Sequence, residues 1–317
     1  MRISSRKLAQ EARSTLTRHS ASGYGVRRFV MPGSPHSRTP GRRLAAASVV
    51  LLASVPTFAA CSAPRSRAAT GPIAQQVEAA ITSGTESFDH AEWDRLLAGG
   101  IDDRGFVDYA FFQDHRADLD RYLAAIAEVE LSTLAPDHLL ALLLNAYNAL
   151  TIASILDHPT VPSIREIDGV WNSRRHPVGG FQLTLDEIEH TVVRPLFRDP
   201  RIHFAVNCAS ASCAPLPRWA FDGDQLDRQL EERTRQFLSD PSNVRIEGST
   251  VLLSSYFDWY GGDFVAAGWE PRADTVLEFV AAYAAADVAA RLRSAEPLQT
   301  RYLEYDWSLN AAVPPRS

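Results

Sequence analysis

The stretch from Asp137 to Leu156 is apolar at nearly every position, so every face of a helix formed there would be hydrophobic. Pro136 stands where proline is favoured at the start of a helix, and Pro159 follows its end. A helix that is apolar all round belongs in the interior of a protein. The sequence therefore predicts a buried central helix over about 136–158.

Amphipathic spacing predicts further helices around this central one. Residues 111–130 place apolar side chains three or four positions apart. Thr184 and Glu187 form a capping-box pattern, which predicts a helix that begins there and reaches about Phe197. The remaining helices are expected over 225–238 and 273–286.

Apolar alternation and turn residues predict a few short strands. Residues 202–207 are expected to form one strand, with 144–151 of the central helix packed against it. Two hairpins are expected, pairing 244–246 with 250–253 and 169–171 with 176–183. Helices outnumber strands, so the prediction is an α+β, helix-rich single domain with a small, mostly antiparallel sheet around a buried central helix.

The first sixty residues are typical of a secretory signal. Residues 1–43 carry nine arginines and Lys7 against a single acid, Glu11, and an uncharged run follows up to Cys61. This order of basic and apolar segments predicts a cleaved signal over 1–60, not a membrane span. Translation from Met31 would leave a compact signal, and it is our candidate for the true start.

Phe58-Ala-Ala-Cys61 resembles the lipobox of bacterial lipoproteins, which implies lipid attachment at Cys61. Cleavage by ordinary signal peptidase near Ala60 is the alternative. We then expect a tether over 61–72, one globular domain over 73–310 and a disordered tail over 311–317. The expected location is the cell envelope, with the membrane reached only through the lipid.

Removal of the signal leaves a strongly acidic chain. Of 32 basic residues ten lie in 1–60, as does one of 38 acids, so 22 basic and 37 acidic residues remain, a net charge of −15. This balance argues against nucleic acid or anionic lipid as the main partner. Lys7 is the only lysine of the chain, which excludes P-loop, Schiff-base and Ser-Lys mechanisms for the domain.

Several segments, in this order, resemble the bacterial domain-of-unknown-function family numbered 547. They are Leu144-Asn-Ala-Tyr-Asn-Ala-Leu-Thr151, Leu185-Asp-Glu-Ile-Glu-His190, Arg201-Ile-His-Phe-Ala-Val-Asn-Cys-Ala-Ser-Ala-Ser-Cys213, Ser254-Ser-Tyr-Phe-Asp-Trp-Tyr-Gly-Gly-Asp-Phe264 and Tyr305-Asp-Trp-Ser-Leu-Asn310. The resemblance covers about 135–310. It implies family membership and brings no known activity with it.

The two cysteines of the domain, Cys208 and Cys213, allow two different roles. A nucleophilic thiolate needs a nearby base, which His203 or His190 could supply. In that hypothesis Glu187 orients the histidine and Asn207 donates to an oxyanion. The alternative is a Cys208–Cys213 disulfide, which an exported protein favours because its compartment is oxidising. The spacings match no standard zinc signature, and we predict neither a metal nor a cofactor.

Two further groups of residues are candidates for ligand binding. Asn145 and Asn148 lie on the same face of the buried helix, where unpaired amides would be costly, so they form a hydrogen-bond network or face a cleft. Tyr256 and Trp259 belong to an aromatic segment that lines a groove or packs into the core.

These observations lead to two hypotheses for the function. The first is a Cys/His-dependent hydrolase or transferase acting on an envelope peptide, ester or glycan. The second is a non-catalytic binding or scaffold lipoprotein that uses the disulfide as a staple. In both, the chain is a monomer that takes an unidentified small-molecule or envelope ligand.

Overall fold

The computed structural model describes residues 71–312, which belong to one compact unit. The predicted signal over 1–60, Met31 and Cys61 lie outside the described residues, as do nearly all of the predicted tether and residues 313–317. Ala311 is paired with Val107 in a parallel bridge, so ordered contacts continue past residue 310.

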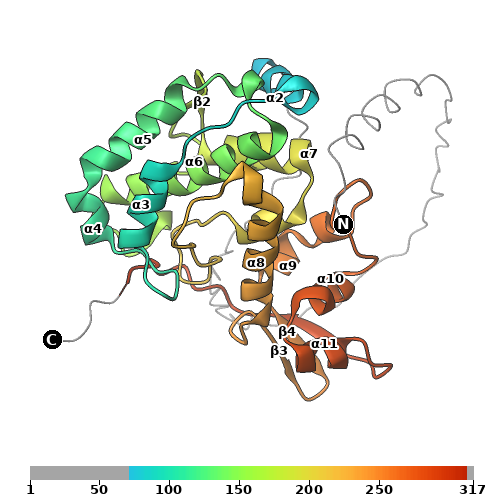
Figure 1. The fold of residues 1–317 in the computed structure, drawn as a ribbon. Helices are drawn as coiled ribbons and strands as arrows, with labels where there is room; N and C mark the ends of the chain where they lie inside the picture. Colours follow the sequence, from blue (N-terminus) through green and yellow to red (C-terminus); the bar gives the residue numbers. More distant parts are fainter. Residues whose placement is uncertain (1–70, 313–317) are drawn as a thin grey trace, which may run out of the picture. The chain divides into compact units, whose positions relative to one another are not determined.

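The prediction of a buried central helix is confirmed by α6 (Pro136–Leu156), which is buried almost throughout. This helix is long and apolar enough to cross a membrane, but its most apolar stretch is wholly buried inside the protein. Three helices lie around it on one side of the unit, α3 (Ala91–Gly100), α4 (Tyr109–Asp114) and α5 (Arg116–Glu128) (Figure 1). Helices α4 and α5 replace the single helix predicted over 111–130.

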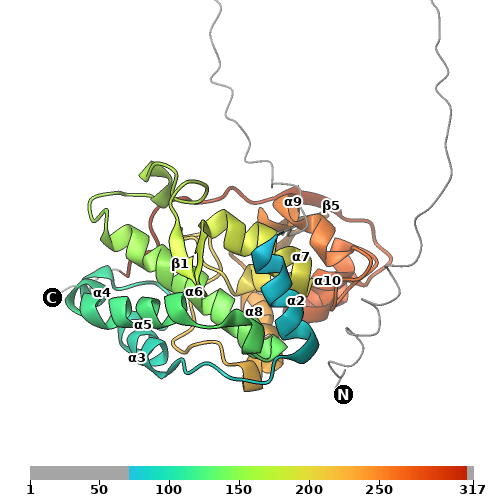
Figure 2. The same ribbon diagram turned by 90° about the horizontal axis from the view of Figure 1, so that it is seen from above.

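Helix α2 (Pro72–Ser83) was not predicted. It packs on α6 and on α7 (Arg194–Phe197), as the view from above shows (Figure 2). At its end, a Cβ on Gly84 would lie 1.8 Å from the carbonyl oxygen of Leu134, so only glycine permits this approach.

The strands form two small sheets. In the first, β1 (His176–Val178) pairs with β2 (Phe181–Leu183) across Gly179 and Gly180, which both have positive φ. The predicted pairing of 169–171 with this region is wrong, because Gly169 starts a turn whose carbonyl accepts from Ser173 and Arg174.

The second sheet has the order β3-β4-β5. Strands β3 (Val244–Glu247) and β4 (Thr250–Leu253) form the predicted antiparallel hairpin. An unpredicted strand, β5 (Gln299–Tyr302), adds to β4 in parallel. The α+β, helix-rich prediction is confirmed.

The strand predicted over 202–207 is wrong, because this segment starts with the 3-10 helix η5 (Pro200–Phe204). Pro200 sets a helical φ, and the carboxylate of Asp199 accepts from the backbone N–H of Arg201 at 2.9 Å. Ile202 belongs to the hydrophobic cluster around α6, whereas Phe204 belongs to a second cluster with β3 and β4. The segment therefore joins the two parts of the core.

The second cluster is covered by α8 (Leu226–Ser239), as predicted, and by α10 (Val276–Tyr283). The helix predicted over 273–286 ends at Tyr283, and α11 (Ala286–Leu292) follows. The short helix α9 (Tyr256–Trp259) and the 3-10 turn η7 (Gly261–Phe264) complete this part.

The capping box of Thr184 and Glu187 is confirmed, with the two reciprocal hydrogen bonds at 2.9 and 3.1 Å. The helix it starts is a π-helix, η4 (Glu187–Val193), which continues into α7. A π-helix changes which side chains share a face, and such turns are frequent at functional sites.

Candidate functional site

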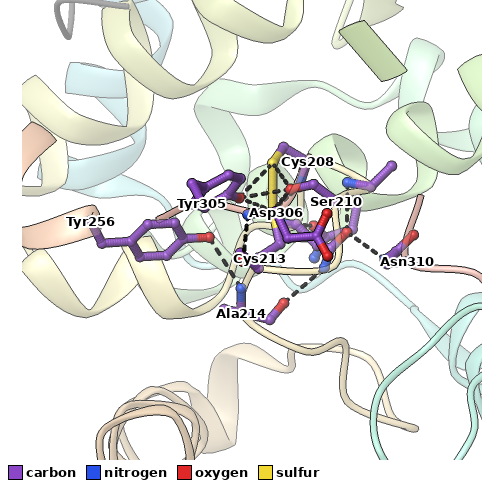
Figure 3. The surroundings of a disulfide bond; sticks show 12 residues. Cys208, Ser210, Cys213, Ala214, Tyr256, Tyr305, Asp306 and Asn310 are labelled. Carbon is purple, nitrogen blue, oxygen red and sulfur yellow. Dashed lines mark hydrogen bonds between the residues drawn. A yellow bond between two sulfur atoms is a disulfide. The ribbon is translucent and has the colours of Figure 1, made fainter. Parts of the chain in front are cut away.

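The loop after η5 carries a disulfide bond between Cys208 and Cys213 (Figure 3). The hydroxyl of Tyr305 lies 3.3 Å from Cys208 Sγ and 3.2 Å from Cys213 Sγ, and 2.7 Å from the hydroxyl of Ser210. Ala209 has a φ of 60°, which lets the loop turn sharply enough to close. In this form neither cysteine presents a thiolate.

No histidine donates to or accepts from either sulfur within residues 71–312. The predicted grouping of Cys208 and Cys213 with His203 or His190 in hydrogen-bond contact is not formed. The structure contains the Cys208–Cys213 disulfide, which was the alternative to a nucleophilic thiolate.

Asn207 holds the start of the disulfide loop in place. Its Oδ1 accepts from the N–H of Ala209 at 2.8 Å and from Asn310 at 3.0 Å, and its Nδ2 donates to the carbonyl of Ala214 at 2.8 Å. Both atoms of the amide are therefore occupied in bonds that shape the loop. Asn310 in turn accepts from the hydroxyl of Tyr109 at 2.6 Å.

The two asparagines of α6 bind the backbone of two different segments. Asn148 donates to the carbonyl of Ala205 at 2.9 Å and accepts from the N–H of Asn207 at 2.8 Å. Asn145 makes the same pair of bonds to the backbone of Phe221, at 2.8 and 3.0 Å. Of the two possibilities for these amides, the structure has the hydrogen-bond network.

His203 is buried and faces the carboxylate of Asp263, with 2.9 Å between Nε2 and Oδ2. Its ring stacks on Tyr260 at a centroid distance of 4.2 Å. Burial lowers the pKa of His203, so the neutral imidazole donates its Nε2 proton to Asp263. The other nitrogen, Nδ1, is buried and has no partner in the described part of the chain.

Arg194 secures Asp263 from the other side, with both Nε and Nη2 2.8 Å from Oδ2. Burial alone would raise the pKa of Asp263, but the hydrogen bond from His203 and the guanidinium charge outweigh it and hold the pKa below its usual range. Arg194 also donates from Nη1 to Nδ1 of His190 at 3.1 Å. The arginine therefore links the two histidines through one charged network.

His190 lies beside Glu189 and Asp186, with Nδ1 3.6 Å from Glu189 and Nε2 4.0 Å from Asp186. Glu187 does not contact it. The carboxylate of Glu187 is used by the capping box and by Arg175, 3.0 Å away. Position i+3 no longer shares a face with Glu187 here because the helix is of the π type.

Aromatic rings adjoin the disulfide. Tyr256 is mostly core, and its hydroxyl accepts from the N–H of Ala214 at 3.1 Å. Trp259 is half-buried, 4.8 Å from the ring of Tyr305 and 5.9 Å from that of Trp307. Trp171 meets Trp307 at 6.2 Å. We call the half-buried rings Trp171, Trp259, Tyr305 and Trp307 the aromatic face.

Sequence reasoning did not single out Arg194, Glu189, Ser210, Trp171 or Trp307 as site residues. The signal for Arg194 was its place four residues after His190. The segment 305–310 contributed to the family resemblance, but nothing in its sequence placed it at the disulfide loop, because only the folded chain brings the two together. No group of three or more His, Cys, Asp or Glu side chains in the described range is arranged to hold a metal ion.

No curated protein matches the chain, and no solved structure does. A family model described as a protein of unknown function, DUF547, matches residues 131–238. The match spans α6, η4, η5, the disulfide loop and most of α8, while Tyr256, Asp263 and Tyr305 lie beyond it. This match supports membership of the DUF547 family over residues 131–238.

Proposed function

We propose that the chain is an exported protein of the cell envelope, anchored by a lipid at Cys61, that binds an envelope ligand without covalent chemistry. The observation that carries this proposal is the Cys208–Cys213 disulfide, to which the hydroxyl of Tyr305 is hydrogen-bonded. It favours the staple over the nucleophile, since both thiols are consumed.

The staple supports a binding role because it positions part of the aromatic face. The hydroxyl of Tyr305 bonds to the disulfide loop, and its ring lies 4.5 Å from Trp307. Aromatic rings held rigidly and left half-buried offer flat apolar surface with little entropy to lose on binding. The face suits the apolar side of a sugar ring or a peptide side chain.

The first experiment determines the state of the thiols. The full chain is exported to an oxidising compartment and purified, and its intact mass and thiol labelling are measured with and without reductant. We expect Cys208 and Cys213 to be labelled only after reduction. Labelling of either residue without reductant would contradict the proposal.

The second experiment tests binding by co-sedimentation with purified peptidoglycan sacculi. Trp259→Ala removes the ring of the aromatic face that lies against both Tyr305 and Trp307. We expect this change to reduce the bound fraction at least five-fold, since anchor aromatics dominate such interfaces. Tyr302→Ala is the matched control, because Tyr302 is an exposed aromatic on β5 that belongs to neither core cluster. Equal binding by both variants would refute a role for the aromatic face.

A histidine-dependent hydrolase or transferase is the second candidate. His203 supports it, because Asp263 orients the ring through Nε2, and the buried Nδ1, which has no partner among residues 71–312, can take a proton. The test is mass spectrometry of soluble products after incubation with sacculi. Release by the wild type that is absent from His203→Gln, at equal folded content by circular dichroism, would favour this candidate over the binding role.

A further inference from the structure

Glu189 is a buried carboxylate with no hydrogen-bond donor in the described part of the chain. It lies on η4 with 8% of its side chain exposed, and it makes no hydrogen bond to any residue from 71 to 312. Buried carboxylates are normally paired or hydrogen-bonded, because desolvation of an ionised group is costly. The Glu189 oxygens are not among the fully enclosed polar atoms, so the carboxylate can accept a partner that residues 71–312 do not supply.

The neighbouring histidine cannot be that partner. His190 Nδ1 is 3.6 Å from Glu189, but the same nitrogen accepts a hydrogen bond from Arg194 at 3.1 Å. A guanidinium has only donors, so Nδ1 must present its lone pair there and carries no proton for Glu189. The guanidinium itself is directed at Asp263.

Two tyrosines lie on elements that adjoin η4, and their hydroxyls have no hydrogen-bond partner among residues 71–312. Tyr147 lies on α6, which packs against η4, and Tyr260 lies 6.2 Å from the ring of His190. Neither hydroxyl makes a hydrogen bond within the described residues, although Tyr147 is only 3% exposed. Burial first, and then the charge of Glu189, raises the pKa of both tyrosines, so both remain neutral phenols with oxygens able to accept.

The charges of this cluster favour a cation. Asp186, Glu189 and Asp263 contribute three negative charges and Arg194 one positive charge, while the geometry makes His190 and His203 neutral. Three negative charges less one positive leave −2 for the cluster, which is part of a domain whose total net charge is −15 once residues 1–60 are removed. A field of this sign attracts cations and repels carboxylates and phosphates.

We propose that the ligand of this protein carries a primary ammonium group, which pairs with Glu189 and donates to the hydroxyl oxygens of Tyr147 and Tyr260. This inference rests on the proposed ligand-binding function and specifies the chemistry of that ligand. An ammonium has three donors and no acceptor, which matches one carboxylate and two phenol oxygens. The cluster is continuous with the aromatic face, since Tyr256 lies 6.2 Å from Tyr260 and 6.2 Å from Tyr305. An amino sugar or a peptide amine combines the two features.

The test compares two probes that differ only in charge, benzylammonium and benzyl alcohol, by chemical-shift titration of the full chain. We expect benzylammonium to bind at least ten-fold more tightly than benzyl alcohol. Glu189→Gln keeps the shape of the side chain and should abolish that difference while leaving the affinity for benzyl alcohol unchanged. Asp258→Asn removes a charge of the same sign from an exposed position on α9 and should retain the difference.

A thermal melt separates binding from folding. Since Glu189 has no hydrogen-bond partner among residues 71–312, Glu189→Gln should melt at the same temperature or higher, a pattern typical of functional residues. A lower melting temperature would show that Glu189 stabilises the fold and would overturn the proposal. Equal affinity of Glu189→Gln and wild type for benzylammonium would overturn it as well.

The two proposals fail in different ways. If benzyl alcohol binds and Trp259→Ala weakens it, but the ammonium adds no affinity, the aromatic face stands and only the ammonium inference falls. If neither probe binds the wild type, the ammonium inference falls, and the sacculi experiment still decides the binding function by itself.

Discussion

Replacement of Asn148 by alanine should destabilise the protein severely. Its amide is the only side chain that bonds both the carbonyl of Ala205 and the N–H of Asn207 within residues 71–312. Alanine would leave both backbone groups buried and unpaired, each at a cost of about 1–3 kcal/mol. The expected loss is therefore about 2–6 kcal/mol, a large fraction of the stability of a typical domain, about 5–15 kcal/mol.

Urea unfolding followed by tryptophan fluorescence measures this loss, as a lower midpoint with an unchanged slope. Thr151→Val is the matched control on the same helix, because its hydroxyl is buried without a partner in the described chain. That variant should keep the wild-type stability or gain about 1 kcal/mol, since a methyl group of similar volume replaces an unpaired hydroxyl. A loss below about 1 kcal/mol for Asn148→Ala would refute the assignment of this amide to the backbone network.

Two further predictions concern the disulfide and a buried histidine. The double variant Cys208→Ser, Cys213→Ser should lower the free energy of unfolding by about 2 kcal/mol, because the disulfide closes a short loop with a sequence separation of 5. An unchanged urea midpoint would contradict a stabilising disulfide. Burial lowers the pKa of His90 from 6.5 to about 4, against the opposing charge of Asp222. Protonation of His90 therefore favours the unfolded chain. The stability that depends on a neutral His90, about 3 kcal/mol, is fully present above pH 6.5 and is lost as the pH falls toward 4. His90→Gln should show a shallower loss of stability than wild type over that range, and identical pH profiles would count against it.

The elements that could be predicted were those specified by their own residues. Helix α6 is apolar on every face, and the Thr184–Glu187 capping box and the β3–β4 hairpin each depend on neighbouring positions. The strand prediction over 202–207 was wrong because alternating apolar residues also suit a 3-10 helix that joins two hydrophobic clusters. Asp199 and Pro200 decided the outcome, and they precede the alternating segment.

The candidate site was only half accessible to prediction. Asn145, Asn148, Asn207, Cys208 and Cys213 carry local signals, and the structure brings them into one network and one disulfide. Their other partners come from residues far along the chain, such as Tyr305, which is 95 residues from Ser210. No local pattern encodes a contact of that range. The pairing of His203 with Asp263, 60 residues apart, was missed for the same reason.

The segment that follows β5 has a consequence for the order of events during synthesis. Asn310 bonds to Asn207 across 103 residues and to Tyr109 across 201 residues. A ribosome releases the chain from its N-terminus, so the cysteine loop emerges long before the residues that cover it. In an exported chain the loop is therefore open to oxidants and to thiol-exchange enzymes until residues 305–310 fold over it, and the hydroxyl of Tyr305 then lies against both sulfurs.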